Sequence, residues 1–253
     1  MAVLDMSYMS YSLKRYVHCK IILPLENTKQ FDADFSTAPD RFKTLYLLHG
    51  FSGNEGDWIY GTEIFKIARD KHLAVVMPSG ENSFYIDDRD RGLLMNQYIG
   101  EELVKATRRL FPLSERREDT FIAGLSMGAF GCMHVGSRYP ETFSKIIALS
   151  GVYDPKDILM QTLLVSQNGF SREYYDSLFL KEKDTCLDTL VRNKQQDCFL
   201  ACGREDPLYA SGRAAYEYLK NNGKDAVWFE TEGNHDFVFW NEGIKRGIQW
   251  LGI

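Results

Sequence analysis

The stretch "FIAGLSMGAFG", residues 121–131, places a single serine, Ser126, between Gly124 and Gly128. The apolar residues that lead up to Ser126 predict a buried β-strand over 119–126, and the residues after it predict a helix. A G-x-S-x-G motif between a strand and a helix is typical of a sharp turn that lifts the serine hydroxyl above the end of a sheet. We therefore predict that Ser126 is a nucleophile; the alternative is a small residue in a loop rich in glycine and alanine.

On both sides of this turn the chain alternates between apolar strands and helices. Residues 8–24 are expected to form one or two edge strands. The pattern predicts further strands at 43–50, 72–80, 119–126, 143–151, 197–206 and 226–233, and helices at 57–69, 96–111, 127–138, 208–221 and 236–252. This alternation predicts an α/β fold, with a mostly parallel central sheet of about eight strands and helices on both faces.

We expect residues 1–253 to form a single domain, because no linker, repeat or low-complexity tract interrupts the chain. The segment 152–195 breaks the alternation of strands and helices. It is expected to be a helical, cap-like excursion that overhangs the sheet. Leu159, Leu163 and Leu164 in this segment are candidates for lining a site beneath it.

Composition argues against several classes of partner. The 253 residues carry a net charge of −5, and 44% of them are hydrophobic. The short basic clusters stand beside acidic residues, so neither a nucleic acid nor an anionic membrane surface is expected as a partner. The first twenty residues lack the pattern of a signal peptide, and no run of about 18 apolar residues predicts a membrane span.

The five cysteines are Cys19, Cys132, Cys186, Cys198 and Cys202. They form no CxxC pair and have no histidine at metal-binding spacing, so we expect no metal site. Their odd number argues against a disulfide framework. We expect reduced packing residues in a cytoplasmic protein.

A nucleophilic serine needs a base, and the base needs a carboxylate to orient it. His235 follows the last predicted strand, in "TEGNHDFVFW", and is the candidate base. The loop "GREDPLY" after the strand at 197–206 offers Asp206 as the carboxylate, with Glu205 as the competitor. Asp236 adjoins the base and is expected to cap the next helix. The chain order Ser126, Asp206, His235 is the order found in α/β-hydrolases.

Acyl transfer also needs donors for a developing oxyanion. The backbone N–H of Met127, directly after the candidate nucleophile, is expected to be one donor. The loop "HGFSGNEGDW" should provide the second, from Phe51 or, alternatively, Ser52. His49 is expected to brace this loop by hydrogen bonding.

Four aromatic residues lie in loops or helix starts near the same edge of the predicted sheet. They are Trp58, Phe84, Tyr85 and Trp240. Aromatic walls suit an acyl group, so we predict that these residues bind substrate. Simple packing in the core is the alternative for each.

Six segments together resemble the esterase D / tributyrin esterase family of serine esterases, whose relatives include S-formylglutathione hydrolases and feruloyl and acetyl-xylan esterases. They are "LYLLHGFSGNEGDW", "MPSGENSFYIDD", "REDTFIAGLSMGAFG", "YPETFSKIIALSG", "GREDPLY" and "GNHDFVFW". The resemblance implies an α/β-hydrolase fold and a cofactor-free esterase for short acyl chains. It also implies a triad of Ser126, Asp206 and His235, with Phe51 and Met127 at the oxyanion.

One departure from the relatives bears on the substrate. S-formylglutathione hydrolases have a "DTSPRG"-like stretch where this chain has "SGENSFYIDD". We therefore expect a carboxylesterase that hydrolyses short-chain acyl esters through an acyl-enzyme. A hydroxycinnamoyl (feruloyl) or acetyl-carbohydrate esterase, an S-formylglutathione hydrolase and an acyltransferase are the alternatives. A small-molecule ester is the expected partner, and a homo-oligomer is left open.

Overall fold

An eight-stranded sheet forms the centre of the computed structural model, which describes residues 1–25, 41–180, 184–193 and 195–253, without the side chains of Ile158, Leu163 and Gln167. Along the sheet the strands are β1 (Ala2–Ser10), β2 (Arg15–Leu23), β4 (Leu73–Pro78), β3 (Lys43–Leu48), β7 (Thr120–Leu125), β8 (Lys145–Leu149), β9 (Asp197–Gly203) and β10 (Ala226–Thr231). The pairs β1–β2 and β2–β4 are antiparallel, and all other neighbours are parallel. The predicted α/β fold with a mostly parallel sheet is therefore confirmed.

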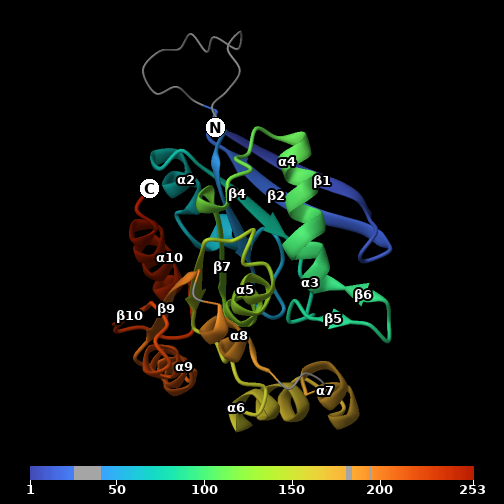
Figure 1. Ribbon diagram of the computed structural model, residues 1–253, viewed down its shortest axis with the longest axis vertical. Helices are drawn as coiled ribbons and strands as arrows, with labels where there is room; N and C mark the ends of the chain where they lie inside the picture. The colour runs from blue at the N-terminus through green and yellow to red at the C-terminus, as the bar shows by residue number, and fades with distance from the viewer. Residues whose placement is uncertain (26–40, 181–183, 194) are drawn as a thin grey trace.

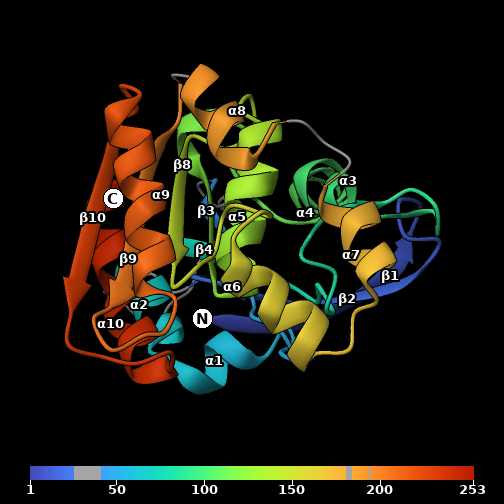
Figure 2. The same cartoon turned by 90° about the horizontal axis from the view of Figure 1, so that it is seen from below.

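The inner parallel strands are mainly apolar runs because helices cover both of their faces. Every residue of β4, "LAVVMP", is buried, and so is every residue of β7, "TFIAGL". One face is covered by α1 (Asp57–Gly61), α2 (Ile64–Asp70) and α10 (Phe237–Leu251). The other is covered by α3 (Met95–Gln97), η1 (Tyr98–Glu102), α4 (Leu103–Leu110), α5 (Met127–Arg138), α8 (Cys186–Arg192) and α9 (Tyr209–Asn221). Figure 2 shows α5, α8 and α9 on one side of the sheet, and α1, α2 and α10 on the other.

The segment 152–195 contributes α6 (Ile158–Gln161), η3 (Thr162–Gln167), α7 (Arg172–Phe179) and α8. Figure 1 shows α6 and α7 beyond one end of the sheet, whereas α8 packs against α5. This is the helical excursion that the break in alternation predicts. Ser171 caps α7, and Thr185 forms a capping box with Asp188 at the start of α8, which defines where these two helices begin.

Three local features differ from the sequence prediction. The expected helix over 57–69 is two helices, because Thr62 adopts an extended conformation between α1 and α2. The edge strand β1 begins at Ala2, six residues before the predicted start at residue 8. The prediction missed these residues because the exposed face of β1 mixes polar and apolar side chains, which obscures the alternating pattern. A small hairpin of β5 (Asp87–Asp88) and β6 (Leu93–Leu94) was not predicted, since two-residue strands carry no periodicity. A short 3₁₀ turn, η2 (Arg117–Asp119), precedes β7.

Parallel strands end at one edge of the sheet, and that edge collects the predicted site residues. Phe51 follows β3, Ser126 follows β7, Asp206 follows β9 and His235 follows β10. Residues far apart in the sequence are thereby brought together in adjacent loops.

Candidate active site

The turn at Ser126 holds a backbone conformation that only close packing can maintain. Ser126 has φ +53° and ψ −118°, a strained pair for a residue with a side chain. Its N–H donates to the Leu149 carbonyl at 2.8 Å. A Cβ added at Gly124 would lie 2.1 Å from the Gly128 carbonyl oxygen, and one added at Gly128 would lie 2.5 Å from that of Leu48. The two glycines of the motif are therefore required by the close approach of β7, α5 and β3.

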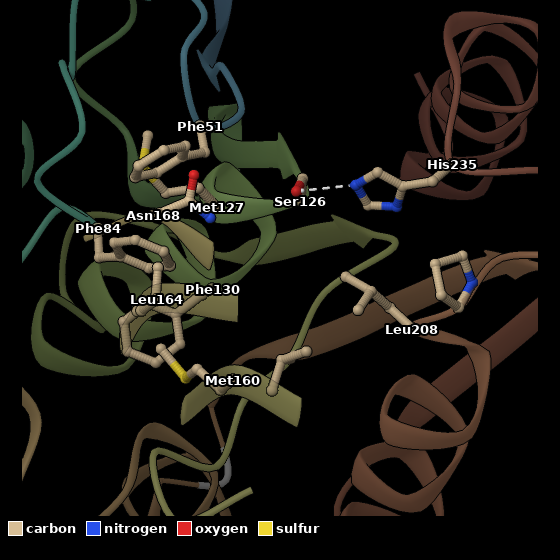
Figure 3. A pocket seen from close by; sticks show the side chains of 12 residues that line it. Phe51, Phe84, Ser126, Met127, Phe130, Met160, Leu164, Asn168, Leu208 and His235 are labelled. Atoms are coloured by element: carbon tan, nitrogen blue, oxygen red, sulfur yellow. Dashed lines mark hydrogen bonds between the residues drawn. The ribbon is translucent and has the colours of Figure 1, made fainter. Parts of the chain in front are cut away.

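Two hydrogen bonds link the three predicted site residues. The Ser126 hydroxyl lies 3.0 Å from His235 Nε2 (Figure 3). His235 Nδ1 lies 2.8 Å from Asp206 Oδ2. A carboxylate only accepts hydrogen bonds, so Nδ1–H donates to Asp206 and Nε2 accepts from the serine hydroxyl. The imidazole is thus oriented with its unprotonated nitrogen toward Ser126.

Asp206 is held in the charged form that this orientation needs. Its side chain is fully buried, which by itself would raise its pKa. The hydrogen bond and charge of His235 and the hydrogen bond from the Leu208 N–H, at 2.8 Å, outweigh burial. The net effect is that the pKa of Asp206 lies below its ordinary value.

The other two carboxylates near His235 have different partners. Glu205 accepts a hydrogen bond from the Gly233 N–H. Asp236 accepts from the N–H groups of Val238 and Phe239, at 3.0 and 3.1 Å, and caps α10 as expected. The structure therefore brings Asp206, and neither competitor, to the imidazole.

Trp240 lies against the imidazole of His235. The two ring centroids are 4.9 Å apart and the rings are nearly perpendicular, at 85°. Trp240 comes from the first turns of α10 and is buried. Its predicted role in binding substrate is corrected: burial beside His235 makes it a support for the ring, and it does not line the cavity described below.

The three candidate oxyanion donors differ in their hydrogen bonding. Within the described residues, neither the N–H of Met127 nor that of Phe51 has a hydrogen-bond partner. The N–H of Ser52 is different, because it donates to Asn82 Oδ1 at 2.7 Å. The alternative donor Ser52 is thereby engaged, and Phe51 is the candidate that the geometry favours.

His49 braces the loop after β3. Its Nδ1 lies 2.7 Å from the Gly50 carbonyl, and its Nε2 accepts from the Gly80 N–H at 2.8 Å. Burial lowers the pKa of His49, so the ring is neutral, with one nitrogen as donor and the other as acceptor. The loop after β3 is tied in this way to the loop after β4.

Tyr85 and Trp58 support the same loop from beneath it. The Tyr85 hydroxyl donates to the His49 carbonyl at 3.0 Å, and Trp58 Nε1 donates to the Leu48 carbonyl at 3.0 Å. Both side chains are fully buried. Their predicted role as cavity walls is corrected, because each polar tip is drawn to a backbone carbonyl inside the protein.

An apolar cavity of about 180 Å³ opens beside Ser126. Ser126, His235 and Asn168 are its polar lining residues. The apolar ones are Phe51, Phe84, Met127, Phe130, Val152, Met160, Leu164, Pro207 and Leu208. Figure 3 shows Phe51, Phe84, Phe130 and Leu164 on one side of Ser126, and His235 on the other.

Sequence reasoning identified only part of this lining. Phe84 and Leu164 line the cavity, Leu159 does not, and the side chain of Leu163 lies outside the described residues. Phe130 was missed, although its position four residues after Ser126 places it on the same helical face. Met160 was missed too, although it lies four residues before Leu164, a spacing that places both side chains on one face of a helix.

The chain is similar to known esterases in sequence and in fold. A model of the family described as "Putative esterase" matches residues 10–250. An acetyl esterase from Caldicellulosiruptor saccharolyticus is 37% identical over 265 residues, which cover 99% of this chain and 98% of that protein. Among solved structures, the Staphylococcus aureus fluorophosphonate-binding serine hydrolase FphF has a TM-score of 0.81 at 26% identity, covering 99% of this chain and 98% of its own. The S-formylglutathione hydrolase FrmB of Staphylococcus aureus has a TM-score of 0.78 at 28% identity, with the same coverage.

The fold and these likenesses define a serine hydrolase of the α/β-hydrolase fold. The chain belongs to the esterase family whose model it matches, and it is a carboxylic ester hydrolase of the serine esterase type. The resemblance inferred from the sequence is therefore confirmed. Within the described residues, no helix has the length and apolar character needed to cross a membrane.

Proposed function

We propose that this enzyme hydrolyses short-chain acyl esters through an acyl-enzyme on Ser126, with Asp206 and His235 completing a catalytic triad. The observation that carries the proposal is the unbroken chain of hydrogen bonds from Ser126 through His235 to Asp206, beside a small apolar cavity. The acetyl esterase relative supports the choice of a short acyl group.

In the proposed mechanism each group has one step. His235 Nε2 takes the proton of Ser126 as Oγ attacks the ester carbonyl, and Asp206 stabilises the imidazolium that forms. The N–H groups of Met127 and Phe51 donate to the oxyanion. His235 then returns the proton to the leaving alkoxide. Water attacks the acyl-enzyme by the same route and releases the acid.

The cavity supports a short acyl chain on grounds of size. Its volume of about 180 Å³ is below the roughly 300–1,000 Å³ of pockets that hold drug-sized ligands. Met160 of α6 and Leu164 of η3 close it from the side of the 152–195 segment. We propose that residues 1–253 form a single domain and that the 152–195 segment is its cap.

A thioester is the second substrate class to be tested, because the FrmB structure is similar over the whole chain. The loop after β4 argues against S-formylglutathione, as its "SGENSFYIDD" stretch departs from the pattern of those enzymes. A panel of acetyl to octanoyl esters, methyl ferulate, an acetylated sugar and S-formylglutathione compares these substrates directly. Efficient transfer to added alcohols would instead favour an acyltransferase.

The cellular compartment is proposed from the cysteines alone. All five are free and buried. Free thiols are typical of proteins in a reducing compartment. We therefore propose that the enzyme works in the cytoplasm, where a small-molecule ester would be its substrate.

Replacement of the nucleophile tests the proposal. Ser126→Ala should lower kcat for p-nitrophenyl acetate by roughly 10⁴- to 10⁶-fold. Ser137→Ala is the matched control, since Ser137 is a buried serine of α5, the helix that follows Ser126, and donates to the His134 carbonyl instead. Wild-type rates in Ser126→Ala would refute the assignment.

A further inference from the structure

A second, smaller cavity lies behind the wall of the acyl cavity. It has a volume of about 30 Å³, and its lining includes Ile86, His134, Leu178 and Phe179. We call it the rear cavity. Among the described residues, Phe130 alone lines both the rear cavity and the cavity beside Ser126.

The direction of the acyl chain follows from the proposed function, on which this inference rests. His235 must reach the leaving oxygen, so the alcohol lies on the His235 side of Ser126. The acyl chain then points to the opposite side, where Phe51, Phe84 and Phe130 are gathered (Figure 3). An acyl chain that extends away from Ser126 therefore meets the Phe130 ring.

The Phe130 ring is fixed by contacts on several sides. It stacks on the His134 ring at 5.4 Å and 17°, and it makes edge contacts with Phe84 and Phe179, each at 6.0 Å between centroids. Phe84 and Phe179 also pack on each other at 5.2 Å. A ring held in this way cannot swing aside for a longer chain without disturbing the whole cluster.

The space behind the ring can accept an apolar chain once the ring is shortened. Ile86, Pro155, Leu178 and Phe179 supply apolar surface there, and the other lining residues include the polar side chains of Arg138, Asp184 and Thr185. His134 is polar, but burial lowers its pKa well below the ordinary value, so that its imidazole is uncharged. Its Nδ1 is already engaged by Arg138 at 2.9 Å.

We propose that Phe130 is the specificity-determining residue that limits acyl chain length, by separating the acyl cavity from the rear cavity. Shortening Phe130 joins the two cavities into one longer channel. Each additional methylene that becomes buried in this channel raises kcat/KM about fourfold. Longer esters should therefore gain relative to acetate.

The test is the ratio of kcat/KM for p-nitrophenyl octanoate to that for p-nitrophenyl acetate. We expect this ratio to rise by at least about tenfold in Phe130→Ala, from several newly buried methylenes. Phe130→Leu is the milder variant, in case Phe130→Ala does not fold, and should give a smaller rise. Phe143→Leu is the control: Phe143 is fully buried on the same face of the sheet, lines neither cavity, and should keep the wild-type ratio.

A ratio within twofold of wild type in a folded Phe130 variant would overturn the inference. A second measurement does not depend on turnover: the affinity for octylboronic acid is compared with that for propylboronic acid, with tryptophan fluorescence as the signal for binding. The octyl compound should gain in Phe130→Leu, and equal affinities in variant and wild type would also overturn the inference. If the wild type and Ser126→Ala hydrolyse acetate equally, the proposed function fails; if only the ratio is unchanged, the inference alone fails.

Discussion

Backbone strain is concentrated around the site. Among the described residues, six of the eight non-glycine residues with positive φ lie in loops at the carboxyl ends of neighbouring strands. They are Ser52, Glu81, Phe84, Tyr85, Ser126 and Ser150. Such conformations persist where the surrounding structure over-determines them, and they are common at functional sites. Here the N–H of Ser126 is held by the Leu149 carbonyl and the N–H of Ser150 by the Ala201 carbonyl, each at 2.8 Å.

Asp206→Asn tests the role of the carboxylate. The amide can present an N–H to His235 and so favour the wrong tautomer, with Nε2 protonated and unable to accept from Ser126. We expect kcat for p-nitrophenyl acetate to fall by about 10⁴-fold, with little change in the fold. Glu205→Gln is the control, since Glu205 is hydrogen-bonded to the Gly233 backbone. Equal activities in the two variants would contradict the assignment.

Asp206→Asn should also change how the stability of the fold depends on pH. The pKa of Asp206 is lower in the folded protein than its ordinary value, through its hydrogen bonds to His235 and Leu208 and despite burial. Such a carboxyl stabilises the fold above its unfolded-state pKa of about 3.9 and loses that contribution as pH falls through the folded value. The Tm of the wild type should therefore fall relative to that of Asp206→Asn as pH is lowered from about 5 toward 3. If the Tm of the wild type and that of Asp206→Asn fall by the same amount as pH is lowered, the stabilising role of the Asp206 carboxylate is contradicted.

The motif at Ser126 depends on the packing of three elements. Gly128 opens α5 and faces the end of β3, where the Leu48 and His49 carbonyls are 2.5 and 2.6 Å from the position of an added Cβ. A side chain there must push backbone away from backbone. The glycine is thus part of the geometry that presents Ser126, in addition to being part of a sequence motif.

Gly128→Ala should therefore lower both stability and activity. We expect a loss of about 1–3 kcal/mol in the free energy of unfolding, together with a lower kcat as β3 and α5 separate. Gly212→Ala is the control, because a Cβ there meets Trp228 at an ordinary 3.4 Å and Gly212 lies within α9. Chemical denaturation and p-nitrophenyl acetate assays compare the two; an equally mild effect would show that the close approach is unimportant.

Some elements could be predicted from the sequence and others could not. Apolar runs such as those of β4 and β7 are buried on both faces, so their pattern is strong and their bounds agree within two residues. The break between α1 and α2 was missed because the apolar spacing continues across Thr62. Trp58 and Tyr85 were misplaced because an aromatic residue near a strand end can face either the cavity or the core. Their hydrogen bonds to backbone carbonyls decide this, and those bonds exist only in the folded chain.

At the scale of the whole molecule, the order of strands determines which loops meet. The loops after β3 and β7 are neighbours in the sheet, as are those after β9 and β10. From the chain order of Ser126, Asp206 and His235 and from their strand-end positions, it was predictable that these three side chains would lie together. The walls of the cavity were less predictable, because Met160 and Leu164 reach it from a segment that lies outside the repeating pattern.

The thiols report on the integrity of the whole fold. All five cysteines are free and buried, and burial raises the pKa of Cys19, in β2, to about 12. The thiols of the native enzyme should therefore react hardly at all with a thiol reagent at neutral pH, because the thiolate is the reactive form. After unfolding in guanidinium, all five thiols should react. Rapid labelling of the native protein would show that these cysteines are more accessible than the packing indicates.

The most direct test of the central claim is to trap the acyl-enzyme. The enzyme is quenched in acid during turnover of p-nitrophenyl acetate, digested, and its peptides are analysed by mass spectrometry. We predict a single acetyl group, on the Ser126 side chain, which accumulates at the same rate as the initial burst of nitrophenol. An acetyl group on another residue, or full hydrolysis with no acetylated Ser126 at any time, would contradict the account.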